Sequence, residues 1–154
     1  MVSLKIMINF DIEDLKKQIT PIAESHNLLL VVIHGSFVTG KNKIGSDLDI
    51  AILGKKLIQF DELLEIHGDF AKIFGDNRER ELDLKSLHDV NPLFRFEVMR
   101  DSVLLYGKTA DYYAFKAYAF RDFQESKSLF GLLDKLIHKR QKYFMENYTT
   151  RHVR

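Results

Sequence analysis

The segment over residues 28–34, LLLVVIH, constrains the fold of this chain more than any other. Six of its seven residues are apolar, and they show no alternation with polar residues. A run of this kind is typical of a strand that is buried on both faces. Gly35 and Ser36 follow directly and end the strand, so we expect a sheet that contains this segment.

Further elements can be placed around this strand from periodicity and turn residues. Two more strands are predicted over residues 47–53 (DLDIAIL) and 80–84 (RELDL). Apolar residues at helical spacing predict helices over 11–26, 59–74, about 92–105 and about 111–148, the last with a break near 124–128. The order predicts an α+β fold, in which a small mixed sheet of three to four strands has helices packed on one side and carries a C-terminal helical arm.

Composition limits the classes of protein. The 154 residues suit one domain, with a core over residues 1–110 and a helical extension of the same domain over 111–154. Lys and Arg number 23 against 22 Asp and Glu, so we expect neither membrane attachment nor direct nucleic-acid binding. The chain has no cysteine, which excludes thiol nucleophiles and disulfides. An N-terminus without a signal-like apolar stretch further favours a cytoplasmic protein.

Three acidic residues are the candidate catalytic and metal-binding residues. Asp47 and Asp49 are two positions apart in a predicted strand, so both side chains point to the same face, roughly 7 Å apart. Asp83, on the next predicted strand, can join them. Such carboxylates stay ionised only beside a positive charge, and Mg²⁺ prefers carboxylate and phosphate oxygens. Two such ions can hold both the attacking and the leaving oxygens of a displacement at phosphorus.

The Gly35-Ser36 pair is a candidate phosphate-binding turn. It lies where the buried strand gives way to a short helix, so backbone N–H groups there are free to bind phosphate oxygens. Glycine allows a close approach, and the Ser36 hydroxyl can donate a further hydrogen bond. Lys41 and Lys43, in the polar stretch that follows, are the nearest cations. A phosphate-binding turn joined to a carboxylate pair by a short segment predicts a nucleotidyl-transfer site.

These residues also have a purely structural interpretation. The carboxylates could be the solvated end of an acidic strand, and Glu81 shares a predicted face with Asp83 and competes with it. Ser36 could act as a helix N-cap, and the two lysines could belong to a solvated turn. His34, just before the pair, could contact a nucleotide or could be satisfied by a neighbouring group.

The segment HGSFVTGKNKIGSDLDIAIL resembles the signature of the DNA polymerase β-like nucleotidyltransferase superfamily. More narrowly, the chain resembles the minimal nucleotidyltransferase (MNT) antitoxins that pair with HEPN-domain RNase toxins. The later stretch FRFEVMRDSVLLYGKTADYYAFKAYAFRDF is similar to the tail of those antitoxins. One feature departs from the pattern: relatives often have arginines after the Gly-Ser pair, where this chain has Phe37, Val38 and Thr39.

The resemblance implies roles for the matching positions. It implies that Gly35 and Ser36 hold the triphosphate of ATP, that Asp47 and Asp49 bind two Mg²⁺ ions, and that Asp83 completes the metal site and helps to deprotonate the attacking hydroxyl. It also implies transfer of AMP to a tyrosine of a partner, a HEPN-domain RNase toxin, which blocks the RNase. Two alternatives stay open, namely AMP transfer to an antibiotic-type small molecule and a non-catalytic antitoxin that acts by binding alone.

The C-terminal region is rich in aromatic residues and, near its end, in basic ones. Ten of the 18 aromatic residues lie within residues 112–148, where they can pack on the sheet or form a protein-binding surface. Over residues 135–154, six basic residues stand against Glu146 alone. This imbalance suits a solvated helix end, or a contact with an acidic partner or RNA.

Overall fold

The computed structural model describes residues 12–41, 46–76 and 81–149. Within these ranges one four-stranded sheet is formed by β1 (Leu28–His34), β2 (Leu48–Gly54), β3 (Leu82–Ser86) and β4 (Val103–Tyr106). The order across the sheet is β3-β2-β1-β4; β3 is parallel to β2, and the other two pairs are antiparallel. The predicted α+β class and mixed sheet are confirmed.

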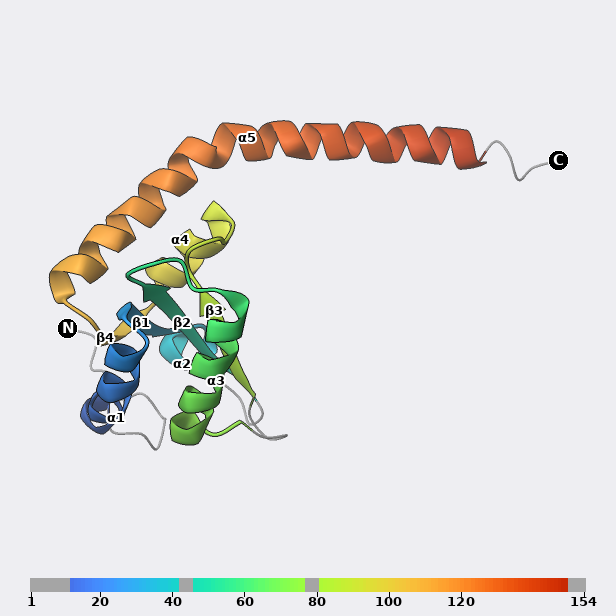
Figure 1. Ribbon diagram of the computed structural model, residues 1–154. Coiled ribbons are helices and arrows are strands. Elements are labelled where there is room, and N and C mark those ends of the chain that lie inside the picture. The colour runs from blue at the N-terminus through green and yellow to red at the C-terminus, as the bar shows by residue number, and fades with distance from the viewer. Residues whose placement is uncertain (1–11, 42–45, 77–80, 150–154) are drawn as a thin grey trace.

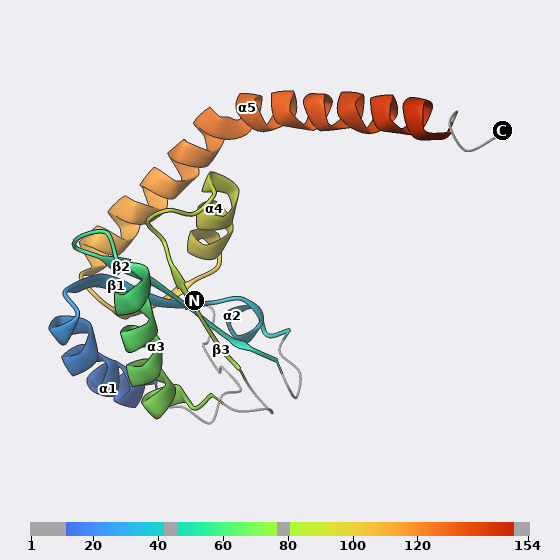
Figure 2. The ribbon, with the colours of Figure 1, turned by 45° about the vertical axis from the view of Figure 1, so that its right-hand side comes forward.

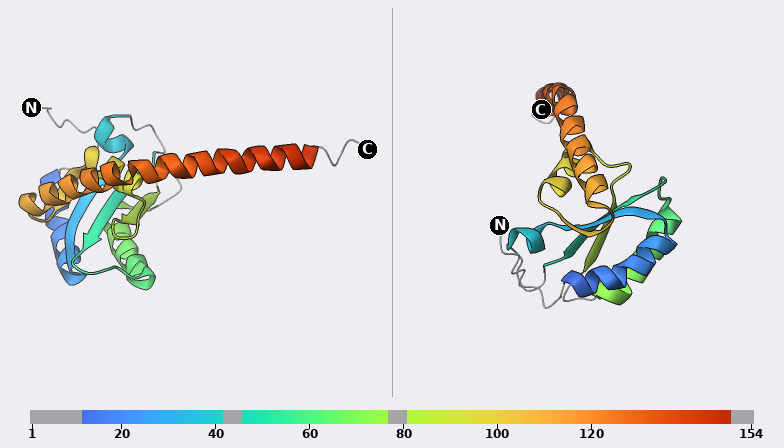
Figure 3. Two further views of the ribbon diagram at one scale, coloured as in Figure 1. Left: turned by 90° about the horizontal axis from the view of Figure 1, so that it is seen from above. Right: turned by 90° about the vertical axis from the view of Figure 1, so that its left-hand side faces the viewer.

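Helices cover both faces of this sheet. The described residues form α1 (Ile12–Ser25), α2 (Ser36–Thr39), α3 (Phe60–Phe74), α4 (Pro92–Arg100) and α5 (Thr109–Thr149). Figures 1 and 2 show α1 and α3 together on one face, with α4 and the first part of α5 on the other, and Figure 3 shows both layers edge-on. The expectation of helices on one side only was therefore wrong. Because β1 and β2 are apolar on both sides, each face requires a cover.

Two apolar cores lie on opposite faces of the sheet. On the first face, Ile19 of α1 and Phe70 of α3 are fully buried against strand residues such as Ile50. On the second face, α4 and α5 cover a smaller core that is built from Leu30, Val32, Ala51, Leu53, Val98, Met99, Tyr112 and Ala119. The second core covers only part of its face, and this leaves the end of β1 and the starts of β2 and β3 for other chemistry.

A strand replaces the end of the helix predicted over residues 92–105. α4 ends at Arg100, and β4 then pairs with β1 as an antiparallel edge strand. The short apolar run Val103–Tyr106 suits either structure by periodicity alone, and the open edge of β1 decides in favour of a strand. The start of α4 agrees with the prediction, since Pro92 lies in its first turn and the Asn91 side chain accepts a hydrogen bond from the amide of Leu93.

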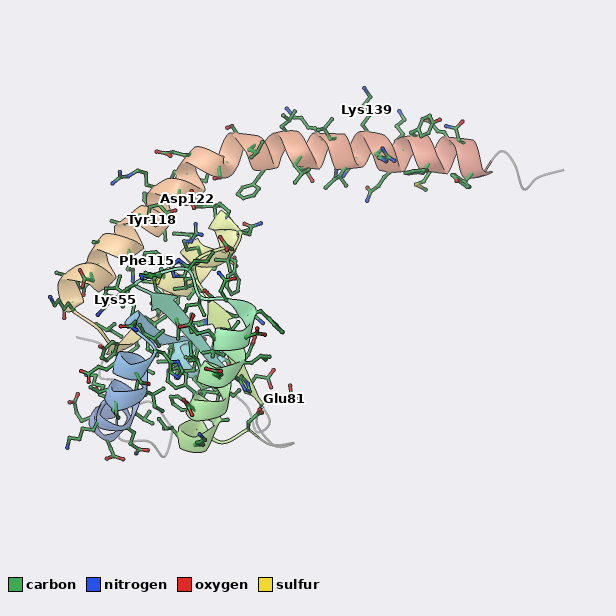
Figure 4. The ribbon with its side chains drawn as sticks, viewed as in Figure 1. Lys55, Glu81, Phe115, Tyr118, Asp122 and Lys139 are labelled. Atoms are coloured by element: carbon green, nitrogen blue, oxygen red, sulfur yellow. The ribbon has the colours of Figure 1, made fainter. Side chains whose placement is uncertain are left out.

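The last helix, α5, is a single element of 41 residues, so the break predicted near 124–128 does not occur. The helix bends instead, between Asp122 and Lys139 as labelled in Figure 4. Its first part packs on α4, where the rings of Phe96 and Phe123 stack with centroids 4.8 Å apart. Every residue from 131 to 148 is exposed, and Figure 1 shows this half projecting away from the sheet.

Among the described residues, no helix combines the length and the apolar character needed to cross a membrane.

Candidate active site

The pairing of β2 and β3 brings two of the predicted carboxylates together. In the parallel register Asp49 lies directly beside Asp83, while the flanking Leu48 and Leu82 enter the core under α1 and α3. Strand alternation therefore places both carboxylates on the face that α4 and α5 cover only in part. Asp47 is exposed immediately before β2, two residues from Asp49.

The electrostatics at Asp49 show that these three acids act on one another. Burial raises the pKa of the Asp49 carboxyl above its usual value, and the negative charges of Asp83 and Asp47 raise that pKa further. The ammonium group of Lys85 opposes them. A carboxylate that is destabilised by burial and by like charges gains from any cation placed beside it. The end of the sheet that carries Asp47, Asp49 and Asp83 is therefore suited to cation binding.

Lys85 is a further candidate residue that the sequence analysis missed. Its Nζ lies 2.7 Å from Oδ1 of Asp83, and both side chains are nearly half exposed. The available signal was the spacing, because residues two apart in a strand point to the same face. An ion pair this exposed contributes at most about 1 kcal/mol, so another cation can displace it at small cost.

The Gly35-Ser36 turn stands against the same carboxylates. Gly35 follows the end of β1, which pairs His34 with Asp49, and its φ of 74° lies in the region that favours glycine. A Cβ at Gly35 would clash with Oδ2 of Asp49, so glycine also permits this close approach. The amides of Val38 and Thr39 donate to the Gly35 carbonyl, at 3.2 and 3.1 Å. The first amides of a helix have no acceptor within that helix, so those of Ser36 and Phe37 are the candidates for binding an anion.

A cavity of about 280 Å³ opens beside this turn, between the end of β1 and α4. His34 and Gly35 form one side of it, and Phe94 and Arg100 of α4 form the other. The His34 ring meets Phe94 edge-on at 6.3 Å, and its Nε2 is buried with no hydrogen-bond partner among the described residues. Burial lowers the pKa of His34, although the charge of Asp83 opposes this effect. The described neighbours therefore do not satisfy this nitrogen.

The other sequence candidates fall outside this cluster. Lys41 is exposed beyond α2, and within the described ranges it forms no ion pair with the three acids. Lys43 lies outside the described residues. Glu81 is exposed before β3, where Figure 4 labels it, and the β2–β3 register sets Asp83, not Glu81, beside Asp49. Arg100, which the sequence analysis did not select, lines the same cavity as Gly35, whereas Lys41 reaches the turn through its backbone amide, which donates to the Ser36 carbonyl at 3.0 Å.

The carboxylate oxygens of Asp47, Asp49 and Asp83 are of the kind that bind a hard divalent cation. Carboxylate oxygens are the ligands that Mg²⁺ prefers, and a cation there would offset the burial and the like charges that raise the pKa of Asp49. As the side chains stand, no group of three acidic or histidine residues in the described part of the chain is arranged to hold a metal ion. Asp83 is engaged by Lys85, and with Asp47 and Asp49 it is the third candidate oxygen ligand at this end of the sheet.

A Gly-Ser turn after one strand and paired carboxylates on the next two strands define a nucleotidyl-transfer fold. The profile of the family described as "Polymerase beta, Nucleotidyltransferase" matches residues 17–111, more than half of the chain. The chain belongs to this family of nucleotidyltransferases.

Individual proteins with this fold extend the comparison. The chain is 25% identical over 96 residues to "Putative protein adenylyltransferase MJ0435" of Methanocaldococcus jannaschii, which covers 60% of this chain and 96% of the relative. A chain in the crystal structure of a toxin-antitoxin with AMP-PNP superposes with a TM-score of 0.65 at 19% identity, over 79% of this chain and 98% of its own. A chain from the complex of a tri-AMPylated Shewanella oneidensis HEPN toxin with MNT antitoxin gives 0.62 at 17% identity, over 82% and 99%.

Proposed function

We propose that this protein is a Mg²⁺-dependent protein adenylyltransferase and antitoxin, which transfers AMP from ATP to a tyrosine of a partner HEPN-domain RNase toxin. The observation that carries the proposal is the register that sets Asp49 beside Asp83 and against the Gly35 turn. The adenylyltransferase name of the archaeal relative supports the reaction, and the toxin-antitoxin complexes with the same fold support the partner.

The proposed metal site uses Asp47 and Asp49, with Asp83 as the third ligand. Mg²⁺ bound there would neutralise the charge of the triphosphate and help to align it for displacement. The Gly35 turn presents its free amides and the Ser36 hydroxyl to the terminal phosphates, so the turn fixes the nucleotide relative to the carboxylates. Lys41 and Lys43, in the segment after the turn, are proposed as outer cations for the triphosphate.

Asp83 is the proposed acceptor of the hydroxyl proton. When Lys85 turns to a phosphate oxygen, the Asp83 carboxylate is free to take the proton of the attacking tyrosine. The tyrosine oxygen then forms a bond to the α-phosphorus, the bond from that phosphorus to the bridging oxygen breaks, and pyrophosphate leaves. The chain's contribution is alignment and charge neutralisation, without a covalent enzyme intermediate.

The test is incubation of the purified protein with its cognate HEPN toxin, ATP and Mg²⁺, followed by intact-mass measurement of the toxin. We expect the toxin to gain one or more adenylyl units, and the D47N/D49N double variant to leave its mass unchanged. Glu81→Gln is the matched control, because it removes an exposed acid next to the site that is out of register with Asp49. A toxin mass that never rises contradicts the transfer.

Neutralisation by contact alone is the second candidate function. Two observations favour it, namely the absence of arginines at Phe37, Val38 and Thr39 and the engagement of Asp83 by Lys85. The two functions differ in one cellular experiment, in which the toxin is expressed with either the wild-type protein or D47N/D49N. If the variant protects the cells as well as the wild type, contact suffices, whereas loss of protection requires the chemistry.

A further inference from the structure

The projecting half of α5 has an apolar surface with no cover. Nine of the sixteen large hydrophobic side chains that are exposed among the described residues lie between Leu129 and Tyr148, a segment termed the distal arm. The family profile ends at residue 111, so the arm lies outside the region that defines the family. Most of the stability of helices in proteins comes from packing of an amphipathic face, and every residue of this arm from 131 to 148 is exposed.

The apolar residues of the distal arm occupy one side of the helix. At about 100° per residue, those that share this side span roughly 160° of the helical circumference; they are Leu129, Leu132, Leu133, Leu136, Ile137, Tyr143, Phe144 and Tyr148. The opposite side carries polar residues such as His138. The arm is therefore amphipathic, with a face wide enough to receive another helix.

The charges on the distal arm are mostly positive and lie at defined places. Lys135, Lys139 and Lys142, at spacings of four and three, form a row along one border of the apolar face. Arg140 lies within the apolar face, where its guanidinium group covers the Phe144 ring at 5.2 Å. Lys142 approaches Glu146 at 3.8 Å, and within the described ranges no carboxylate lies at ion-pair distance from Lys135 or Lys139.

These positions disfavour a second copy of the chain as the occupant. In a parallel symmetric pair, Arg140 of one copy would face Arg140 of the other inside the apolar seam. In an antiparallel pair, equivalent borders face each other, so the lysine row would meet its own copy. Among the described residues, Glu146 is the one acid on the lysine border, so both arrangements bring mainly like charges together, and a partner with acidic groups at all these positions pairs with them better.

We propose that the distal arm is a docking site for an amphipathic helix of a partner protein that carries acidic residues beside its apolar stripe. Carboxylates on the partner would pair with the Lys135–Lys139 border and with Arg140. A lipid surface fits less well, because Arg140 would enter the acyl region and the polar side also carries acidic residues. The proposal concerns binding only and does not rest on the proposed AMP transfer.

The probe is a pair of synthetic helical peptides of about four heptads, with leucine at the a and d positions. One peptide has glutamate at every e and g position and the other has lysine, so neither peptide pairs with itself. Fluorescence anisotropy without ATP then measures the binding of each labelled peptide to the full chain. We expect the acidic peptide to bind at least about tenfold more tightly, with an affinity that falls as salt is added. Equal binding of the two peptides, or no binding of the acidic one, overturns the proposal.

Two variants locate the binding on the arm. Leu136→Glu should weaken acidic-peptide binding about tenfold, whereas His138→Glu adds the same charge to the opposite side and should have a much smaller effect. The double variant K135E/K139E keeps good helix formers and should reverse the preference toward the basic peptide, which an unfolded arm could not do. A wild-type dimer that Leu136→Glu dissociates, or binding to phosphatidylserine vesicles in place of the acidic peptide, would also overturn the proposal.

Discussion

The two faces of the sheet are built from the same strands but have different compositions. On the face under α1 and α3, alternate residues of β2 such as Ile50 and Ile52 are fully buried in a continuous apolar core. On the other face the same strand presents Asp49 and then Ala51, so apolar packing under α4 and α5 covers only its far end. Stability is thus concentrated on one face, and this allows the other to hold mutually repelling carboxylates.

The largest expected effect separates activity from stability at Asp49. Asp49→Asn should lower the rate of AMP transfer on the order of 10³-fold, because a lost metal ligand removes several kcal/mol of charge stabilisation. The same substitution should leave the free energy of unfolding unchanged or raise it, since burial and the charges of Asp83 and Asp47 destabilise the ionised carboxyl. Single-turnover kinetics and urea unfolding measure the two quantities, and a marked loss of stability would show that Asp49 supports the fold.

The neighbouring residue should show the opposite behaviour. Ile50 points into the core under α1 and α3 and is fully buried. Ile50→Ala should lower the free energy of unfolding by about 3 kcal/mol, because it removes buried methyl groups and leaves a cavity. In the fraction that stays folded, transfer per molecule should be unchanged. If the folded fraction of Ile50→Ala lost as much turnover as Asp49→Asn, the assignment of stability to one face and activity to the other would be wrong.

The cover of the second face depends on one buried arginine. Arg95 of α4 donates to Asp122 of α5 at 2.6 Å and to the carbonyl oxygens of Leu87 and His88, and its side chain is only 8% exposed. Figure 4 labels Asp122 beside α4.

Arg95→Met should lower the free energy of unfolding by about 2 kcal/mol, which is below the range for a fully buried pair because Asp122 is partly exposed. Arg100→Met removes an exposed pair with Asp101 and an exposed contact with the Phe96 ring and should change stability by less than about 1 kcal/mol. Thermal unfolding compares the two variants.

The division between the faces also explains what the sequence could predict. The strand over 28–34 and the Asp47, Asp49 and Asp83 spacing follow from local rules, because alternation fixes which side chains share a face. The strand β4 was missed because its four apolar residues fit a helix or a strand equally well, and only the open edge of β1 decides. Arg95 could not be found from the sequence, because its partner Asp122 lies 27 residues away.

The Lys85–Asp83 pair was within reach of the same alternation rule. The side chains are two residues apart on one strand, so a shared face could have been expected. Periodicity cannot show, however, whether a lysine beside three acids pairs with one of them or extends into solvent. That choice depends on the packing of β3 beside β2, which sets Asp83 against Asp49.

The smallest expected effect is a pH dependence of stability that arises at His34. Burial holds the pKa of His34 below its usual value, so near pH 6 the unfolded chain binds more protons at this residue than the folded one. Stability linked to His34 should therefore rise as the pH increases to about 6.5 and should not change with pH above it. His34→Leu should reduce the difference in unfolding free energy between about pH 5.5 and about pH 7.5. Urea unfolding at the two pH values measures this, and an unaltered difference in His34→Leu would mean that the burial of His34 does not disfavour the charged imidazole.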